Sequence, residues 1–372
     1  MAQQQGGGWG RGETPYDKWE KGEDIPLYSG SHVDDLFHCE VKPWARFGDK
    51  AKGAIANLAG QQQDDGWIIE VAPGAETAPV HHMFEATYFV ISGRGATTFW
   101  QPGKAKQTVE WKEGSLFSPP LNCHYQHFNL DGQNPARIFA GTTAPRSINL
   151  LRSGDWAFSD DYVFADRFSG EEDDFFSDPG RMVGVRRWKT NFVPDVRSFK
   201  LDSWEERGAG GTNMFFSVAG NSMSAHLSDF PTGTYKKAHR HGPGAYIIVL
   251  NGVGYSMLWF KDEKEPTKVD WKNGSLVSPM DQQYHQHFNP GTTNARYLAY
   301  TYPVGGGAAQ AAEQAEANPG QRAGGGADVS EREGGMQVEY EDEMPIIWNT
   351  FDSETKRHGA QNMQAKPNYR KE

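Results

Sequence analysis

The chain has 372 residues, which is enough for two domains with substantial cores. Its formal net charge of −11 argues against a nucleic-acid partner, because a phosphate-binding surface needs clustered Lys and Arg. No apolar run approaches the roughly 20 residues needed to span a bilayer, and the N-terminus lacks the basic-then-apolar order of a secretory signal. We therefore expect no membrane partner. Two cysteines, Cys39 and Cys123, cannot form a disulfide framework, so we expect a cytoplasmic protein, with a single bridge between them as the less favoured alternative.

The first part of the chain, residues 1–60, is expected to be an N-terminal arm. Residues 1–24 are rich in Gly, Gln and charge, and we interpret them as loose. Residues 25–60 carry scattered aromatic side chains, which could pack against a barrel or against a neighbouring subunit.

From Gly66 onward, short runs of β-branched and aromatic residues are separated by Gly, Pro and Asn. Such runs are typical of strands. The expected strands cover residues 67–71, 87–91, 96–100 and 137–141 in the first half, and 214–218, 246–250, 255–259 and 296–300 in the second. Many short strands punctuated by turns predict an all-β protein, with one barrel over residues 61–150 and another over 206–303.

The remaining segments have other compositions. Residues 151–205 contain an acidic stretch and a few apolar anchors, and we expect a connector that straps the barrels together. Residues 304–338 have almost no large apolar side chains, which predicts a disordered linker. In the tail, 339–372, the sequence PIIWNTFDSETKRHG predicts a short helix that ends at Gly359 and docks on a barrel, its own or a partner's.

An internal duplication connects the two halves. Segment 74–129 (GAETAPVHHMFEATYFVISGRG … WKEGSLFSPPLNCHYQHFN) aligns with 233–289 (GTYKKAHRHGPGAYIIVLNGVG … WKNGSLVSPMDQQYHQHFN). The offset is 159 residues at the start and 160 at the end, so the copies differ by one loop residue. A duplication of this kind indicates two copies of one structural unit.

The second copy carries a candidate metal site. His239 and His241 lie two residues apart on a predicted strand, so their side chains point the same way, and His285 follows after a predicted hairpin. Three imidazoles that converge from adjacent strands suit a divalent transition metal and leave positions open for water, substrate or O2.

The first copy acts as an internal control for this site. Its residues at the three ligand positions are Val80, His82 and Tyr125, so two of the three ligands are absent. The glycines, in contrast, recur in both copies, and we interpret them as fold residues placed where turns need positive φ. The histidines are therefore extra to the fold, and one metal site is expected in the second barrel only.

These residues resemble the double motif of the cupin superfamily. The first motif reads Gly233, His239, His241, Ala245, Gly252, and the second reads Gly274, His285, Asn289. The resemblance covers roughly a third of the chain and implies a bicupin, two double-stranded β-helix (jelly-roll) barrels in tandem, here with a short C-terminal helix. Many cupins have a glutamate as fourth ligand where this chain has Ala245, and the proline and glycine of the second motif are displaced or replaced.

A three-histidine site with Ala in place of Glu is similar to that of the gentisate and salicylate ring-cleaving dioxygenases. The resemblance implies Fe2+ that binds substrate and O2. That family usually keeps its working site in the N-terminal barrel, whereas the complete site here lies in the C-terminal one. Cupin barrels often pair through edge strands and swapped arms, so the resemblance also implies a homodimer.

Three functions are compatible with these patterns. The favoured one is an Fe2+-dependent dioxygenase acting on a small aromatic or enolic compound, with Tyr246, Trp259, Gln283 and His287 as candidate pocket or catalytic residues. The second is a non-oxidative lyase, isomerase or decarboxylase that uses the same ligands. The third is a non-catalytic ligand-binding protein. Imidazole ligands serve Mn2+, Ni2+, Cu2+ and Zn2+ as well as Fe2+, so the metal stays open.

Overall fold

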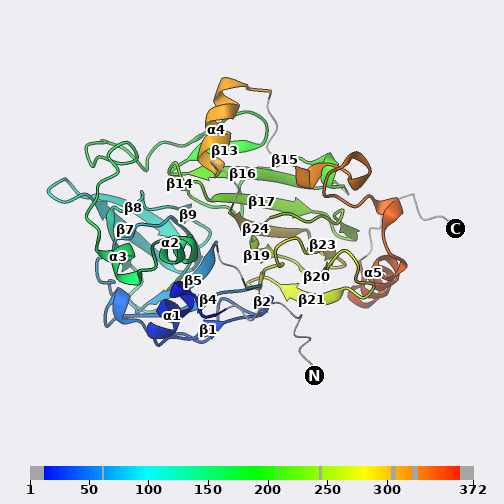
Figure 1. Ribbon diagram of the computed structural model, residues 1–372, viewed down its shortest axis with the longest axis horizontal. Coiled ribbons are helices and arrows are strands. Elements are labelled where there is room, and N and C mark those ends of the chain that lie inside the picture. Colours follow the sequence, from blue (N-terminus) through cyan, green and yellow to red (C-terminus); the bar gives the residue numbers. More distant parts are fainter. Residues whose placement is uncertain are drawn as a thin grey trace.

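The computed structural model describes residues 12–60, 63–208, 210–242, 245–302, 307–320 and 326–360. The chain forms two β barrels side by side, the first in the blue and cyan part of the sequence and the second in the green and yellow part (Figure 1). All eight expected strands are present, which confirms the all-β architecture. None of the helices within the described ranges is long and apolar enough to cross a membrane.

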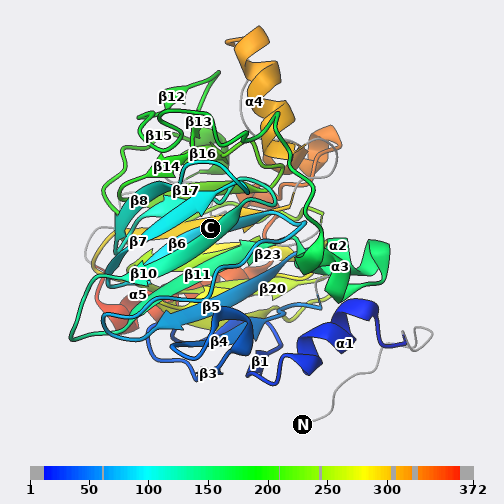
Figure 2. The ribbon, with the colours of Figure 1, turned by 90° about the vertical axis from the view of Figure 1, so that its left-hand side faces the viewer.

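Each barrel combines a large sheet with a small one. In the first barrel the large sheet has the order β1-β4-β5-β11-β6-β9-β14, with β3 beside β4, and the small sheet has the order β10-β7-β8 (Figure 2). The strands of the large sheet are β1 (Leu27–Tyr28), β3 (Lys42–Pro43), β4 (Ala51–Ala56), β5 (Asp65–Val71), β6 (Ala86–Ser92), β9 (Leu116–Phe117), β11 (Ala136–Thr142) and β14 (Phe192–Val193). Those of the small sheet are β7 (Arg94–Trp100), β8 (Gln107–Lys112) and β10 (His124–Asn129).

The second barrel repeats this plan. Its large sheet has the order β12-β13-β16-β17-β24-β19-β22-β2, with β15 beside β16, and its small sheet has the order β18-β23-β20-β21. The strands of the large sheet are β2 (His32–Val33), β12 (Arg181–Met182), β13 (Arg187–Thr190), β15 (Asp202–Ser203), β16 (Thr212–Val218), β17 (Ser224–Phe230), β19 (Ala245–Asn251), β22 (Leu276–Val277) and β24 (Ala295–Thr301). Those of the small sheet are β18 (Thr234–Tyr235), β20 (Val253–Trp259), β21 (Thr267–Lys272) and β23 (Tyr284–Asn289).

The two barrels exchange edge strands. Strand β2, from the first half of the chain, pairs with β22 of the second barrel, and β14, from the connector, pairs with β9 of the first. The large sheets also share one apolar core, to which Ile68 and Phe139 of the first barrel and Phe216 and Leu298 of the second contribute. Because this core is fully buried, the barrels are held together by packing as well as by strand exchange.

The repeated glycines have two different structural roles. Gly93 and Gly252 have φ of 91° and 97°, a left-handed conformation that favours glycine, as expected. Gly95 and Gly254 have no positive φ. A Cβ on Gly254 would lie 2.4 Å from the Trp271 ring, and one on Gly95 would clash in the same way with Trp111. The second pair is thus needed for close packing, which corrects the expectation that all these glycines serve turns.

The segments outside the barrels are more ordered than the sequence predicted. Helix α1 (Pro15–Gly22) is fixed by a capping box between Thr14 and Asp17, and it buries Tyr16 against the first barrel. The expectation of a loose arm over 1–24 is therefore wrong for this part, while residues 1–11 lie outside the described ranges. Strand β4 is an integral strand of the first barrel, so this barrel begins before residue 61.

The segment expected to be a disordered linker, 304–338, contains helix α4 (Gly307–Ala317), the orange helix in Figure 1. Its small side chains permit close packing, because Ala308, Ala312 and Ala315 are all buried. Residues 303–306 and 321–325 lie outside the described ranges. Helix α2 (Ala144–Leu151) ends the segment assigned to the first barrel, and the connector adds helix α3 (Gly154–Ser159).

The tail forms the expected helix, and of the two expected docking sites, a barrel of its own chain or of a partner, the structure shows the chain's own second barrel. Helix α5 (Pro345–His358) ends at Gly359 and buries Ile347 and Phe351. The Phe351 ring lies 4.7 Å from that of Tyr235, centroid to centroid, within a cluster formed by the small sheet. The described residues also form short 3-10 turns: η1 (Ala45–Phe47), η2 (Glu205–Arg207), η3 (Gly326–Asp328), η4 (Glu331–Glu333) and η5 (Tyr340–Asp342).

Candidate metal centre

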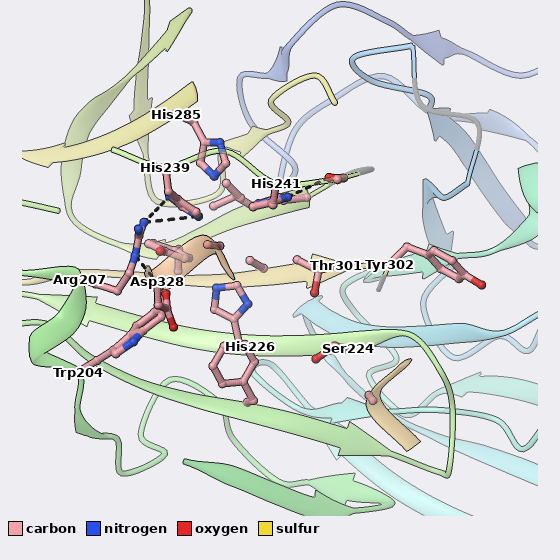
Figure 3. A pocket seen from close by; sticks show the side chains of 18 of the residues that line it. Trp204, Arg207, Ser224, His226, His239, His241, His285, Thr301, Tyr302 and Asp328 are labelled. Atoms are coloured by element: carbon pink, nitrogen blue, oxygen red, sulfur yellow. Dashed lines mark hydrogen bonds and ion pairs between the residues drawn. The ribbon is translucent and has the colours of Figure 1, made fainter. Parts of the chain in front are cut away.

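The structure brings the three predicted ligands together. His285 lies on β23, and its backbone forms an isolated bridge with His239, through N–H···O contacts of 3.2 and 2.9 Å. His241 follows and accepts a backbone hydrogen bond from Gln282, 3.0 Å long. One ligand nitrogen from each ring lies within 4.8 Å of the others (Figure 3). The expected continuous strand through His239 and His241 is not formed, but the single bridge is enough to align the rings.

The protonation of the rings suits a cation. Burial lowers the pKa of His239, His241 and His285, so all three are neutral near pH 7. Nδ1 of His241 lies 2.9 Å from the Gly242 carbonyl oxygen, and Nδ1 of His285 lies 3.1 Å from that of Gln283. Each Nδ1 donates its proton there, since a carbonyl only accepts. The lone pair of these two rings is therefore on Nε2, the arrangement that metal-binding histidines usually have.

His239 has a different partner. The Arg207 guanidinium donates a hydrogen bond to its Nδ1, and the same nitrogen lies 3.4 Å from its Nε2. A guanidinium has donors only, so it occupies a lone pair of this ring. A metal held by all three histidines would compete for that lone pair and repel the guanidinium. The donor set thus fits a divalent transition metal, provided that Arg207 turns away from the His239 ring.

A cavity of about 310 Å³ adjoins the three histidines. Its opposite wall is the large sheet of the second barrel, where Phe215, His226 and Ala299 lie on the neighbouring strands β16, β17 and β24. Trp204 and Arg207 close one side, and Thr301 and Tyr302 lie toward the other (Figure 3). A mostly apolar cavity with a few converging polar groups is the usual form of a small-molecule site.

Asp328 and Arg207 form a polar pair beside the histidines. Nε of Arg207 lies 4.0 Å from a carboxylate oxygen of Asp328, and its Nη1 donates to Gln337, 2.9 Å away. Burial raises the pKa of Asp328, although the charge of Arg207 opposes the shift. The cavity therefore combines a guanidinium that can bind an anion with a carboxyl group that can carry a proton.

The candidate catalytic residues lie in different places. His287 lines the cavity, but its Nδ1 is 2.8 Å from the Ser256 hydroxyl, and His127 of the first barrel makes the same contact with Thr97 at 2.7 Å. Burial lowers the pKa of both histidines to about 3. A contact present in both barrels supports a structural role for His287.

Tyr246 and Gln283 are not brought to the cavity. Tyr246 is fully buried in the core between the barrels, where its hydroxyl accepts a hydrogen bond from the Leu58 backbone, 3.1 Å long. Its neighbours in sequence, Ala245 and Ile247, do line the cavity, because successive residues of a strand face opposite sides. Gln283 accepts a hydrogen bond from the Met280 backbone.

The remaining candidate, Trp259, and the two cations that flank the histidines of the first motif, Lys237 and Arg240, make contacts outside the cavity. Trp259 stacks on Tyr284 with 5.5 Å between ring centroids. Lys237 forms an ion pair of 2.6 Å with Glu339, and Arg240 lies 2.8 Å from the Gln282 side-chain oxygen. Neither cation lines the cavity.

Sequence reasoning missed Arg187, Arg207 and Asp328, all of which line the cavity. The duplication itself extends far enough upstream to reveal Arg207: the sequence Trp44-Ala-Arg-Phe-Gly recurs as Trp204-Glu-Glu-Arg-Gly. Arg207 thus replaces Phe47, a fully buried residue of the first barrel. Asp328 has no counterpart within the duplicated segments, and no local pattern distinguishes it.

No protein-family model and no curated protein matches the sequence. The fold, however, is similar to solved structures of oxalate decarboxylase from Bacillus subtilis. A tryptophan-to-tyrosine variant of that enzyme has a TM-score of 0.50 and 13% sequence identity, with 74% of this chain and 77% of that chain covered. The structure of the enzyme at pH 4.6 gives 0.49 and 12%, with 74% and 76% covered.

A further structure of the same enzyme, solved in a study of its Mn(II) centres, has a TM-score of 0.49 and 13% identity over 74% of this chain and 78% of that one. At such identities the likeness establishes the fold alone. The fold is that of a bicupin, as the two histidine motifs had indicated.

Proposed function

We propose that this protein is a metal-dependent enzyme that carries out a non-oxidative reaction, such as decarboxylation, on a small carboxylate. One observation carries the proposal: the three histidines share a cavity with the Arg207–Asp328 pair. This is the second of the three functions compatible with the sequence, and the enzyme named among the structural neighbours is also a decarboxylase.

His239, His241 and His285 would hold the metal, and Mn2+, Fe2+ and Zn2+ all suit imidazole ligands. A bound divalent cation would polarise a carboxylate and stabilise negative charge that develops on the substrate. Arg207, once repelled from the His239 ring, is positioned to bind the anionic group of the substrate.

Asp328 supplies the proton that the reaction needs. In a decarboxylation the bond between the carboxylate carbon and the rest of the substrate breaks, CO2 leaves, and the electron pair remains on the adjacent carbon. That carbon then takes a proton from the Asp328 carboxyl group, which regains one from water. The raised pKa of Asp328 favours the protonated form required for this role. No oxidant takes part.

An Fe2+-dependent dioxygenase, the function favoured by the sequence, is the second candidate. It is supported by Ala245, which is 2% exposed and lines the cavity where a carboxylate ligand would otherwise stand. A site with three neutral ligands leaves more positions open on the metal. This reaction would require O2 but no protein acid.

The two candidates differ in oxygen dependence and in their need for Asp328. We suggest incubating the metal-loaded full chain with a panel of small carboxylates, with and without O2, while measuring CO2 release and O2 uptake. The proposal predicts CO2 release without O2 and a loss of rate of about 10²–10⁴-fold in Asp328→Asn, the usual range for a general acid.

Asp342→Asn is the matched control, because Asp342 lies on the same C-terminal segment but is exposed and paired with Arg332. Its rate should equal that of the unmodified protein. Strict dependence on O2, with activity retained in Asp328→Asn, would favour the dioxygenase. Ligand binding without turnover of any compound, under either atmosphere, would identify a binding protein.

A further inference from the structure

The wall of the cavity opposite the histidines carries a buried cation. Strand register aligns three residues of the large sheet: Arg187 on β13 pairs with Phe215 on β16, which pairs with His226 on β17. All three line the cavity. Neighbouring strands lie about 4.8 Å apart, so Arg187 stands roughly two strand spacings from His226, toward the edge of the sheet.

Arg187 is buried but has no acidic partner. Its exposed fraction is 8%, and no carboxylate within the described ranges forms an ion pair with it. Its protein contacts are one donated hydrogen bond to the Ser217 hydroxyl, 3.3 Å long, and the Phe215 ring, 5.6 Å from the guanidinium carbon. A buried guanidinium is costly unless a charge and several acceptors compensate it. Most hydrogen-bond donors of the Arg187 guanidinium are therefore available to another molecule.

Two further polar atoms on this wall are unpaired within the described structure. The Ser224 hydroxyl and Nδ1 of His226 are both buried and without a hydrogen-bond partner. Because Ser224 and His226 are two residues apart on β17, their side chains point from the same face of the sheet into the cavity (Figure 3). Unpaired polar groups that line a cavity are suited to a polar ligand.

The first barrel shows that the fold does not need the polar groups of Arg187 and His226. There the same register aligns Leu27 on β1, Ile55 on β4 and Trp67 on β5. Leu27 therefore occupies the position of Arg187, and Trp67 that of His226. The row is entirely apolar in the first barrel, whereas two of its three residues are polar in the second, which indicates a function specific to the second barrel.

We propose that Arg187, assisted by Ser224 and His226, binds the distal acidic group of the substrate. The substrate would then be an organic acid with two anionic ends and an apolar middle: one end held at the histidines and Arg207, the middle beside Trp204 and Phe215, the other end at Arg187. The assignment of the first end rests on the proposed function. The distal subsite rests on Arg187 and its surroundings alone.

Calorimetric titration of the metal-loaded full chain tests this assignment. The probes are the linear dicarboxylates from succinate to suberate and the aromatic diacid terephthalate, each compared with its own monoamide, which keeps the shape but loses one charge. We expect the best diacid to bind at least about tenfold more tightly than its monoamide, since a hydrogen bond to a charged group contributes about 1.5–3 kcal/mol.

Arg187→Met should abolish the preference for the diacid over its monoamide while leaving the affinity for the monoamide unchanged. Arg187→Lys should keep part of that preference. The lysine variant and a thermal melt of each protein show whether a loss of affinity comes from a folding defect. Arg181→Met is the matched control, because Arg181 lies on the neighbouring strand β12 but is exposed and paired with Glu316.

The outcomes separate the two proposals. Equal affinity of every diacid and its monoamide, or an unchanged preference in both Arg187 variants, would overturn the distal subsite even if the protein releases CO2 from smaller acids. Preference for a diacid that depends on Arg187, with no turnover of any carboxylate, would leave the subsite standing and overturn the enzyme.

Discussion

The two barrels have the same strand order, but the interior of the first is filled with side chains, whereas that of the second contains a cavity. In the first barrel the Tyr125 hydroxyl lies 2.9 Å from Nε2 of His82 and 2.6 Å from the Tyr88 hydroxyl, and Phe84 stacks on the His82 ring at 4.0 Å. These residues belong to a closed core. In the second barrel the positions of His82 and Tyr125 are held by His241 and His285, which border a cavity. The first barrel thus has packed side chains where the second has a site. Comparing them separates the residues that the fold requires from those that the chemistry requires.

Trp67 and His226 illustrate the exchange most directly. Both pair with an alanine of the adjacent central strand, Ala140 on β11 and Ala299 on β24. Trp67 is fully buried among aromatic rings, with Trp44 at 5.2 Å and Phe84 at 5.5 Å. The smaller His226 leaves the space that becomes part of the cavity. The difference in side-chain volume at this register position thus contributes to the difference between the barrels.

Removing one histidine from each barrel tests the asymmetry with the largest expected effect. His241→Ala should weaken metal binding by more than about a hundredfold, which is the upper end of the loss expected even for a residue that only orients a ligand. His82→Ala should leave metal binding unchanged, because its Nδ1 and Nε2 are both used in contacts with Phe84 and Tyr125. Metal analysis after dialysis measures both. Equal metal loss from the two variants would refute a single working barrel.

Truncation at the equivalent positions Trp67 and His226 should separate packing from function. Trp67→Ala should lower the free energy of unfolding by about 3–5 kcal/mol, as expected for a large buried aromatic side chain. His226→Ala should cost clearly less, because its ring already faces the cavity. Urea denaturation of both variants provides the comparison. Similar losses would mean that the second barrel has a packed interior like the first.

The sequence predicted the parts of the molecule that local patterns encode. The strands followed from short apolar runs, and the three histidines from comparing the copies. Helix α1 was missed although Thr14, Pro15 and Asp17 form a recognisable start signal. Helix α4 was missed because composition alone suggests disorder, while its alanines are stabilised by packing against residues distant in sequence, such as Val183.

The rest of the site depends on tertiary contacts. Arg207 and Asp328 are far apart in sequence and meet only because the C-terminal segment returns to the barrel, where the Val338 backbone bonds to that of Ala238. Tyr246 is close to the first motif in sequence, but the alternation of strand faces directs it into the core between the barrels.

A last difference between the barrels should appear in the pH dependence of stability. Asp64 precedes β5, and its counterpart before β17 is Met223. Burial, followed by repulsion from Asp65, raises the pKa of Asp64 to about 8. The folded state therefore holds a proton that the unfolded state releases near pH 4. Between these values the folded state binds more protons, so its stability falls as the pH rises, by up to about 1.4 kcal/mol per pH unit.

Asp64→Asn removes this titration while keeping the size of the side chain. The stability of the variant relative to the unmodified protein should increase from pH 5 to pH 8. Buried histidines such as His127 have the opposite effect, because their stabilisation is lost as the pH falls below 6.5. Their contribution is the same in both proteins and cancels in the difference. Thermal melts in matched buffers measure the difference. Asp49→Asn, at an exposed position, should give a curve parallel to that of the unmodified protein. If the stability curve of Asp64→Asn is also parallel to that of the unmodified protein, Asp64 is ionised in the folded protein. The first barrel would then contain a buried charge at a position where the second barrel has an uncharged methionine.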